Sequence, residues 1–420
     1  MSESAPVADL RPLQLFFLAA AVFVVAAGYG SLLPLLPSWL TRLMPGSTAA
    51  EVSRQVGFLS AACTAGVLVG APIWGMISDR LGQPCILVLG LTGYVTSLLL
   101  LLPTSMRGMW VLFGLRVSTG VFVAAVVPVV PALVAAYTPP ERRARRFAWL
   151  GAASLLGFLF GPALNALATV IATLLSKTDA NAAVATRVVI VLAAMLGASM
   201  MLGLALTLPR QRQAPVAAAD STAPSDRTGV MQLWLLSMIV NFVVSGFELG
   251  IVLQSRQHLG STTQDISLMF AVCSGVMLLV NAILFFTNLL DKASPRLVIG
   301  IGSLIGAGGL ALLGWHESSV WMLVGISLTS AGTGLVLPVI AFLAAGVARR
   351  SLGTTMGTLA AAAGLGQTLG ASAAGWLFGA LASSGFAWLA LPLVATLLLL
   401  RVLRPSRLDA PVVLPRGHVA

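Results

Sequence analysis

Long apolar runs separated by short polar segments make up almost the whole chain. A helix that crosses the hydrocarbon core of a membrane needs about 20 mostly apolar residues. Twelve runs have about this length, and they cover residues 13–36, 56–77, 84–103, 109–136, 147–174, 187–208, 231–253, 266–289, 296–314, 320–344, 354–381 and 386–403. The pattern predicts an all-α membrane protein with twelve transmembrane helices.

A polar segment divides these runs into six and six. It is rich in Ala, Pro, Ser, Asp and Arg and has no hydrophobic period, which is typical of a flexible linker. We therefore expect an N-terminal half over residues 1–208, a cytoplasmic linker over 209–230 and a C-terminal half over 231–404. Residues 405–420 are expected to form a cytoplasmic tail without regular structure.

The composition supports a membrane protein and argues against nucleic-acid binding. The chain is 58% hydrophobic and 9% charged, whereas soluble domains carry roughly a quarter charged residues. The net charge is +11, but almost all the charges lie between the apolar runs, and they form no basic stripe with aromatic residues. The expected partners are the lipid bilayer and a small-molecule substrate, with no nucleic acid, and we expect a monomer.

The distribution of basic residues predicts the orientation of the chain. If the N-terminus is cytoplasmic, that side receives 17 Lys and Arg residues and the other side receives 6. Because basic residues accumulate on the cytoplasmic side, both termini are expected there. The first run is too long for the core of a signal peptide and is interpreted as a retained helix. We expect an integral protein of a bacterial inner membrane.

The segment Gly75-Met-Ile-Ser-Asp-Arg-Leu-Gly82 is the most informative motif of the chain. It is interpreted as a tight polar loop between two antiparallel helices, with Asp79 and Arg80 at the aqueous edge. Gly-x-x-x-Asp-Arg-x-Gly after the second apolar run resembles the signature loop of the major facilitator superfamily of secondary transporters. That family usually places one or two basic residues after the last glycine, and this chain does not.

The resemblance extends over nearly the whole chain and implies two six-helix halves related along the membrane normal. Features of the first half recur at corresponding places of the second: Asp79 as Asp291, Gly157 as Gly366, and Gly161 as Gly370. Such transporters hold their substrate between the halves near mid-membrane. The resemblance therefore predicts that Gly75, Asp79, Arg80, Gly82 and Asp291 belong to a conformational switch.

The fifth run contains Gly157, Gly161 and Pro162, which belong to the same predicted switch. Small residues four apart allow close helix packing, and the proline removes a backbone donor. This pattern resembles the helix 5 signature of proton-driven drug antiporters, although the closing Gly-Gly of that family is Asn165-Ala166 here. The alternative is that the glycines serve helix packing alone.

Two charged residues lie well inside predicted spans, away from the span ends. Arg116 stands in the fourth run and Glu248 in the seventh, at comparable depth from the same membrane face. Intramembrane charges are costly and mark substrate or proton pathways. Arg-x-x-x-Gly in the fourth helix also resembles a superfamily motif associated with proton coupling. We interpret Glu248 as the proton-coupling carboxylate and Arg116 as its alternating partner. The alternatives are an arginine that snorkels to the surface, a local role for the carboxylate, or a permanent bridge.

Four uncharged polar residues within the spans are candidates for the substrate cavity: Asn165, Asn241, Asn281 and Gln367. Each could equally bond a neighbouring helix. The chain contains no Gly-x-Ser-x-Gly elbow, phosphate-binding loop or His-Glu-x-x-His motif, so an enzyme is not expected. Its 3 Cys and 3 His residues have no metal-ligand spacing. No cofactor or metal is expected, and the proton gradient is the expected energy source.

These features favour a proton-coupled exporter, an antiporter of small organic molecules such as drugs, toxic metabolites or a siderophore. The first alternative is an importer or uniporter of sugars, organic acids or amino acids on the same fold. The second is a membrane receptor or scaffold that does not transport.

Overall fold

The computed structural model describes residues 10–102, 108–138, 140–175, 182–208, 227–258, 263–287, 293–315, 318–347 and 352–402. All regular elements in these residues are helices. The first half contains α1 (Pro12–Leu32), η1 (Leu33–Leu35), α2 (Leu36–Leu43), α3 (Ala49–Leu81), α4 (Gln83–Leu100), α5 (Met109–Val123), α6 (Val129–Ala136), α7 (Pro140–Leu175) and α8 (Ala182–Thr207). The second half contains α9 (Arg227–His258), α10 (Thr263–Phe286), α12 (Pro295–Trp315), α13 (Ser319–Val347), α14 (Leu352–Leu381), η3 (Ala382–Ser384) and α15 (Gly385–Val402).

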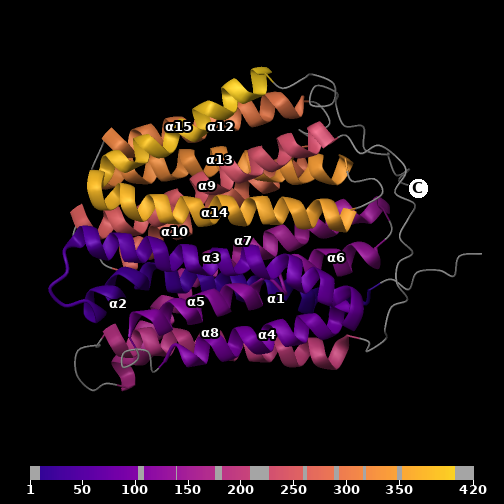
Figure 1. Ribbon diagram of the computed structural model, residues 1–420, viewed down its shortest axis with the longest axis horizontal. Helices are drawn as coiled ribbons and strands as arrows, with labels where there is room; N and C mark the ends of the chain where they lie inside the picture. The colour runs from indigo at the N-terminus through magenta and orange to yellow at the C-terminus, as the bar shows by residue number, and fades with distance from the viewer. Residues whose placement is uncertain are drawn as a thin grey trace, which may run out of the picture.

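The helices lie roughly side by side along one axis in two groups (Figure 1). The indigo-to-magenta helices of the first half form the lower group of this view, and the orange-to-yellow helices form the upper one. Helix α14 packs along α3 at the boundary, and α10 packs against α7. Two helices of each half therefore form most of the interface between the groups.

Ten helical segments among the described residues are long and apolar enough to cross a membrane. One of them, Thr358–Arg401, contains most of both α14 and α15, and the apolar helix Met109–Val123 is slightly shorter than the others. Counting α14 and α15 separately and including α5 gives twelve crossings. The predicted all-α membrane fold with twelve helices in two halves is confirmed.

Several helices extend beyond the predicted spans, and the first and fourth spans also differ from the prediction in how they are built. The first span continues beyond residue 36, because η1 and α2 extend the helical chain to Leu43. The fourth span, predicted as one helix over 109–136, is broken between α5 and α6. Pro128 lies at this break, where it has no N–H group to donate to the preceding turn.

The predicted polar loop from Gly75 to Gly82 is almost entirely helical. Helix α3 continues to Leu81, and α4 begins at Gln83. The turn is therefore confined to Gly82, whose φ of 86° lies in the left-handed region that favours glycine. The expectation of a loop was wrong because the polar residues occupy the last turns of a helix. The backbones of Asp79 and Arg80 belong to α3, and Asp291 lies outside the described residues.

The second half begins earlier than expected. Helix α9 starts at Arg227, inside the segment 209–230 predicted as a linker. The rest of that segment and the predicted tail lie outside the described residues. The assignment of residues 209–226 as a linker and 405–420 as a tail stays a prediction.

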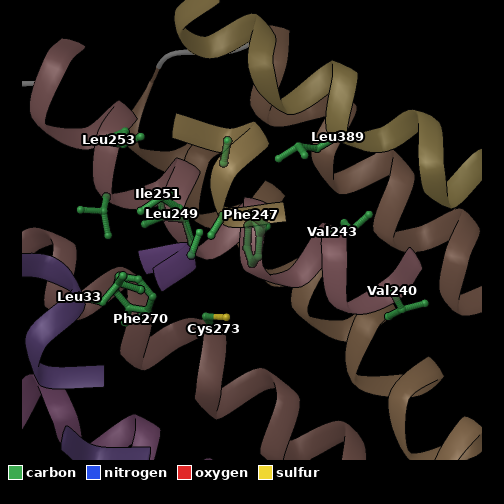
Figure 2. Close-up of a cluster of buried hydrophobic side chains, with 14 of the residues drawn as sticks. Leu33, Val240, Val243, Phe247, Leu249, Ile251, Leu253, Phe270, Cys273 and Leu389 are labelled. Carbon is green, nitrogen blue, oxygen red and sulfur yellow. The ribbon is translucent and has the colours of Figure 1, made fainter. Parts of the chain in front are cut away.

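A large cluster of buried apolar side chains joins the two halves. It includes Leu33 of η1 and Phe270 of α10, which lie next to each other in Figure 2. Much of the rest comes from α9, where Val243 and Phe247 are among the labelled side chains. This packing fixes the position of α9, which carries Glu248.

Candidate functional site

Arg116 is buried in the first half. Its side chain projects from the middle of α5 and is 2% exposed. Its Nε atom has no hydrogen-bond partner, and among the described residues no ion pair or hydrogen bond of the guanidinium is found. An arginine that snorkels to the surface would expose its head, so the low exposure excludes that alternative in this conformation.

Two tyrosines interact electrostatically with Arg116. They are Tyr29 of α1 and Tyr94 of α4. Tyr94 is 2% exposed, and its hydroxyl has no hydrogen-bond partner in the described part of the chain. An arginine and two phenol groups from three different helices thus interact within one region of the first half.

The position of the Tyr94 hydroxyl depends on two glycines. The Tyr94 ring passes Gly197 of α8, where an added methyl group would lie 3.4 Å from the ring atom Cε1. Its hydroxyl ends against Gly28 of α1, where a methyl group would overlap the oxygen. Gly28 therefore makes the space that allows a phenol from α4 to reach α1.

Glu248 lies on α9 at the boundary with the first half. Its neighbours Phe247 and Leu249 are each 1% exposed and belong to the cluster in Figure 2, whereas Glu248 itself is partly exposed. Glu248 interacts electrostatically with Tyr29 from the first half and with Cys273 of α10. No hydrogen bond or ion pair of this carboxyl group is found within the described ranges.

The predicted pair of charges is not in contact in this conformation. No ion pair joins Arg116 and Glu248 in the described structure, and Tyr29 interacts with both. A permanent bridge is therefore not the arrangement seen here. The role of Arg116 as an alternating partner stays a prediction.

An aromatic row leads from Tyr29 across the interface. The ring centroids of Tyr29 and Phe158 of α7 are 6.0 Å apart, and those of Phe158 and Phe270 of α10 are 5.6 Å apart. Sequence reasoning did not find this row. Tyr29 is one of only 3 tyrosines in the chain and lies in an apolar run, which is the one signal that pointed to it.

The four amide residues predicted to line a cavity make hydrogen bonds within the protein. Asn165 Nδ2 donates to the carbonyl oxygen of Ser31 at 3.0 Å, and its Oδ1 has no partner in the described part. Gln367 Nε2 donates to Asn241 Oδ1 at 3.1 Å. Asn281 Nδ2 donates to a carbonyl oxygen of its own helix at 2.7 Å. In this conformation these bonds join helices or turns, and a role toward substrate stays a prediction.

Gly157 and Gly161 of α7 pack directly on α1. A methyl group on Gly161 would lie 2.6 Å from the carbonyl carbon of Gly30, and one on Gly157 would overlap the carbonyl oxygen of Phe23. Pro162 lies inside α7, which continues through it. In the second half, Gly366 and Gly370 of α14 meet carbonyl oxygens of α9 in the same way. The glycines thus serve helix packing in both halves.

Helices α3 and α14 approach one another closely where the halves meet. A methyl group on Gly57 would lie 2.6 Å from Cα of Gly375. Farther along, Thr368 Oγ1 donates a hydrogen bond to Thr64 Oγ1 at 3.1 Å. These contacts run from the end of the bundle that carries α2 and η3, called the α2 end below, to the middle of both helices. No group of residues that could hold a metal ion is found among those described.

Comparison with known proteins identifies the class to which this fold and site belong. The model of the Major Facilitator Superfamily matches residues 15–286 and 233–418, so the chain belongs to this family. It is an integral membrane transporter and not an enzyme. The receptor or scaffold alternative is thereby set aside.

Two relatives carry names that refer to drug resistance. Multidrug resistance protein 2 of Bacillus subtilis (strain 168) is 25% identical over 297 residues, which cover 69% of this chain and 70% of that protein. Quinolone resistance protein NorA of Staphylococcus aureus (strain Mu50 / ATCC 700699) is 29% identical over 152 residues. The NorA match covers 36% of this chain and 37% of NorA.

Solved structures show the same fold at lower identity. The human organic anion transporter MFSD10 (TETRAN) has a TM-score of 0.70 at 20% identity, and the match covers 93% of this chain and 100% of that one. The transporter FucP in its outward conformation has a TM-score of 0.64 at 14% identity, covering 92% and 98% of the two chains. These likenesses are to the fold.

Proposed function

We propose that the protein is a proton-coupled antiporter that exports small organic molecules, such as drugs, toxic metabolites or a siderophore. Export is supported by the drug-resistance names of the two relatives. The excess of basic residues on one side supports a bacterial inner membrane protein with both termini in the cytoplasm.

The observation that carries proton coupling is the environment of Glu248. A carboxyl group at the boundary between the halves, without a hydrogen bond or ion pair among the described residues, can exchange its proton without breaking a fixed contact. Ionisable residues inside membranes mark such pathways. We propose that Glu248 takes a proton from outside and releases it inside as the halves rock.

Arg116 has the second role in this proposal. In other conformations of the cycle, Arg116 approaches the deprotonated Glu248 and offsets part of its burial cost. Protonation of Glu248 releases Arg116 again. Tyr29, which interacts with both residues, lies where such an approach would take place.

The test uses inverted membrane vesicles and the fluorescent cation ethidium. An acidic vesicle interior should drive ethidium accumulation by the wild type. Glu248→Gln should lose this accumulation while ethidium still binds, because the amide side chain cannot take up and release a proton. Glu51→Gln is the matched control, since Glu51 is half-buried at the start of α3 and its cap on the Thr48 backbone N–H at 2.8 Å can be made by an amide oxygen.

Accumulation by Glu248→Gln at the wild-type level would assign coupling to another group. Ethidium accumulation in right-side-out vesicles instead of inverted ones would favour the importer on this fold.

A further inference from the structure

The guanidinium of Arg116 is a buried cation for which the described part of the chain supplies no ion-pair partner. It has five N–H donors and no acceptor, so a ligand with two acceptor oxygens satisfies it best. Its Nε atom has no hydrogen-bond partner among the described residues, and the residue is only 2% exposed. Burying a charge without a partner is costly, and a bound anion would offset that cost.

The Tyr94 hydroxyl is a second donor without a partner in the same region. It interacts electrostatically with Arg116 and is also buried. The space for this hydroxyl depends on Gly28, so the backbone of α1 is shaped around it. Two orphaned donors from α4 and α5 can serve one oxyanion.

The surroundings favour an organic anion over an inorganic one. Tyr29 follows Gly28 on α1, interacts with Arg116 and begins the aromatic row with Phe158 and Phe270. Aromatic faces accept the flat apolar body of a ligand. Glu248 of the other half interacts electrostatically with Tyr29, the first ring of this row.

We propose that Arg116 and the hydroxyl groups of Tyr94 and Tyr29 form a binding site for the carboxylate of the transported compound. Glu248 then binds the cationic group of the same molecule, so the substrates include aromatic zwitterions. The inference rests on the proposed export function, which it deepens by naming a substrate class. A cationic group at Glu248 displaces the proton, which is the competition that an antiporter requires.

The test compares three probes on the purified full-length protein by calorimetric titration. The probes are 6-(aminomethyl)-2-naphthoate, 2-naphthoate and 2-naphthylmethylammonium, which share one ring system. The zwitterion should bind at least about tenfold more tightly than either singly charged probe, because each charged contact adds a strong hydrogen bond. Equal binding of the zwitterion and the ammonium probe would overturn the carboxylate site.

Variants assign the contact to named residues. Tyr94→Phe should weaken binding of the zwitterion and of 2-naphthoate by about tenfold and leave the ammonium probe unchanged. Tyr137→Phe, which alters the third tyrosine of the chain away from Arg116, is the matched control. Arg116→Lys should also weaken the two carboxylates, since an ammonium group cannot replace the planar fork. If Tyr94→Phe weakens the binding of all three probes equally, the Tyr94 hydroxyl has a structural role and the proposal is overturned.

The proposed export function and the proposed carboxylate site can be rejected independently of each other. If proton-driven ethidium export is present while the carboxylate makes no difference to binding, the inference fails and the proposed function stands. If the zwitterion binds as expected but no proton-driven export occurs, the site stands and the exporter assignment fails.

Discussion

At the scale of single residues, Gly161 decides how closely two helices of the first half pack. Its Cα lies against the backbone of Gly30 and Ser31, and one turn later Asn165 donates to the Ser31 carbonyl oxygen. The lack of a side chain at Gly161 brings α7 near enough to α1 for that hydrogen bond. Close packing and an interhelical hydrogen bond thus support each other at one point.

We expect Gly161→Leu to abolish transport and to lower stability by about 1–3 kcal/mol, because the backbones must separate to admit the side chain. Thermal unfolding of the purified protein and vesicle transport measure the two effects. Gly151→Leu is the control in the same helix, since Gly151 is exposed and has open space around it. Equal stability of the two variants would mean that this contact does not hold the helices together.

Sequence reasoning at this scale found unusual residues but not their neighbours. Arg116 and Glu248 could be selected because charges within apolar runs are costly wherever they point. The neighbours Tyr29 and Tyr94 could not, since a tyrosine in a membrane helix is ordinary until the packing of other helices places it. The space at Gly28 that admits the Tyr94 hydroxyl is a property of three helices together.

At the scale of elements, the break in the fourth span frees a backbone carbonyl group. Beyond α5 the N–H group of Ala125 bonds the carbonyl of Phe122 at 3.1 Å, three residues back, instead of the carbonyl of Val121. The Val121 oxygen accepts the indole N–H of Trp74 at 2.6 Å. A side chain of α3 therefore satisfies the group that the break leaves unpaired, as a membrane protein requires.

Trp74→Phe should lower the free energy of unfolding by about 1–3 kcal/mol, because the Val121 carbonyl loses its partner in a buried place. Unfolding by SDS titration measures the change. Trp149→Phe, at an exposed position of α7, should leave the midpoint unchanged. A midpoint for Trp74→Phe as high as that of Trp149→Phe would show that water or another donor replaces the indole.

The length of the apolar run alone did not predict this break between α5 and α6. Residues 109–136 have enough hydrophobic length for one helix, and the prediction gave Pro128 no weight. The opposite error occurred between Gly75 and Gly82, where polar residues in the last turns of α3 were taken for a loop. Hydropathy locates the spans well. Helix limits depend on capping residues and backbone hydrogen-bond donors, which hydropathy does not measure.

At the scale of the whole molecule, α3 and α14 hold the halves together from the α2 end to mid-membrane. Small residues bring the backbones into contact at Gly57 and Gly375, and Thr64 and Thr368 add a hydrogen bond between the halves. Sequence reasoning predicted two halves but not which helices join them. The residues that do so are Gly, Ser and Thr, which occur on many faces of these helices.

We expect Thr64→Val and Thr368→Val each to reduce the ratio of molecules closed at the α2 end to molecules open there by about threefold, since an interhelical hydrogen bond in a membrane is worth about 0.6 kcal/mol. Spin labels at positions 42 and 381 report the distance across that end. The double variant should equal either single one, because all three lack the same bond. Additive effects would mean that the two threonines act separately. Thr333→Val is the control, since Thr333 bonds only its own helix in the described structure.

The paired glycines have a consequence for how such a gene diverges. Gly157 and Gly161 pack within the first half, and Gly366 and Gly370 pack within the second, so neither pair needs the other. Selection can then preserve the scaffold of each copy separately while mutations accumulate on the surfaces that face each other. An arginine on one copy without a counterpart on the other, as at Arg116, is the asymmetry that descent from a duplicated ancestor would permit.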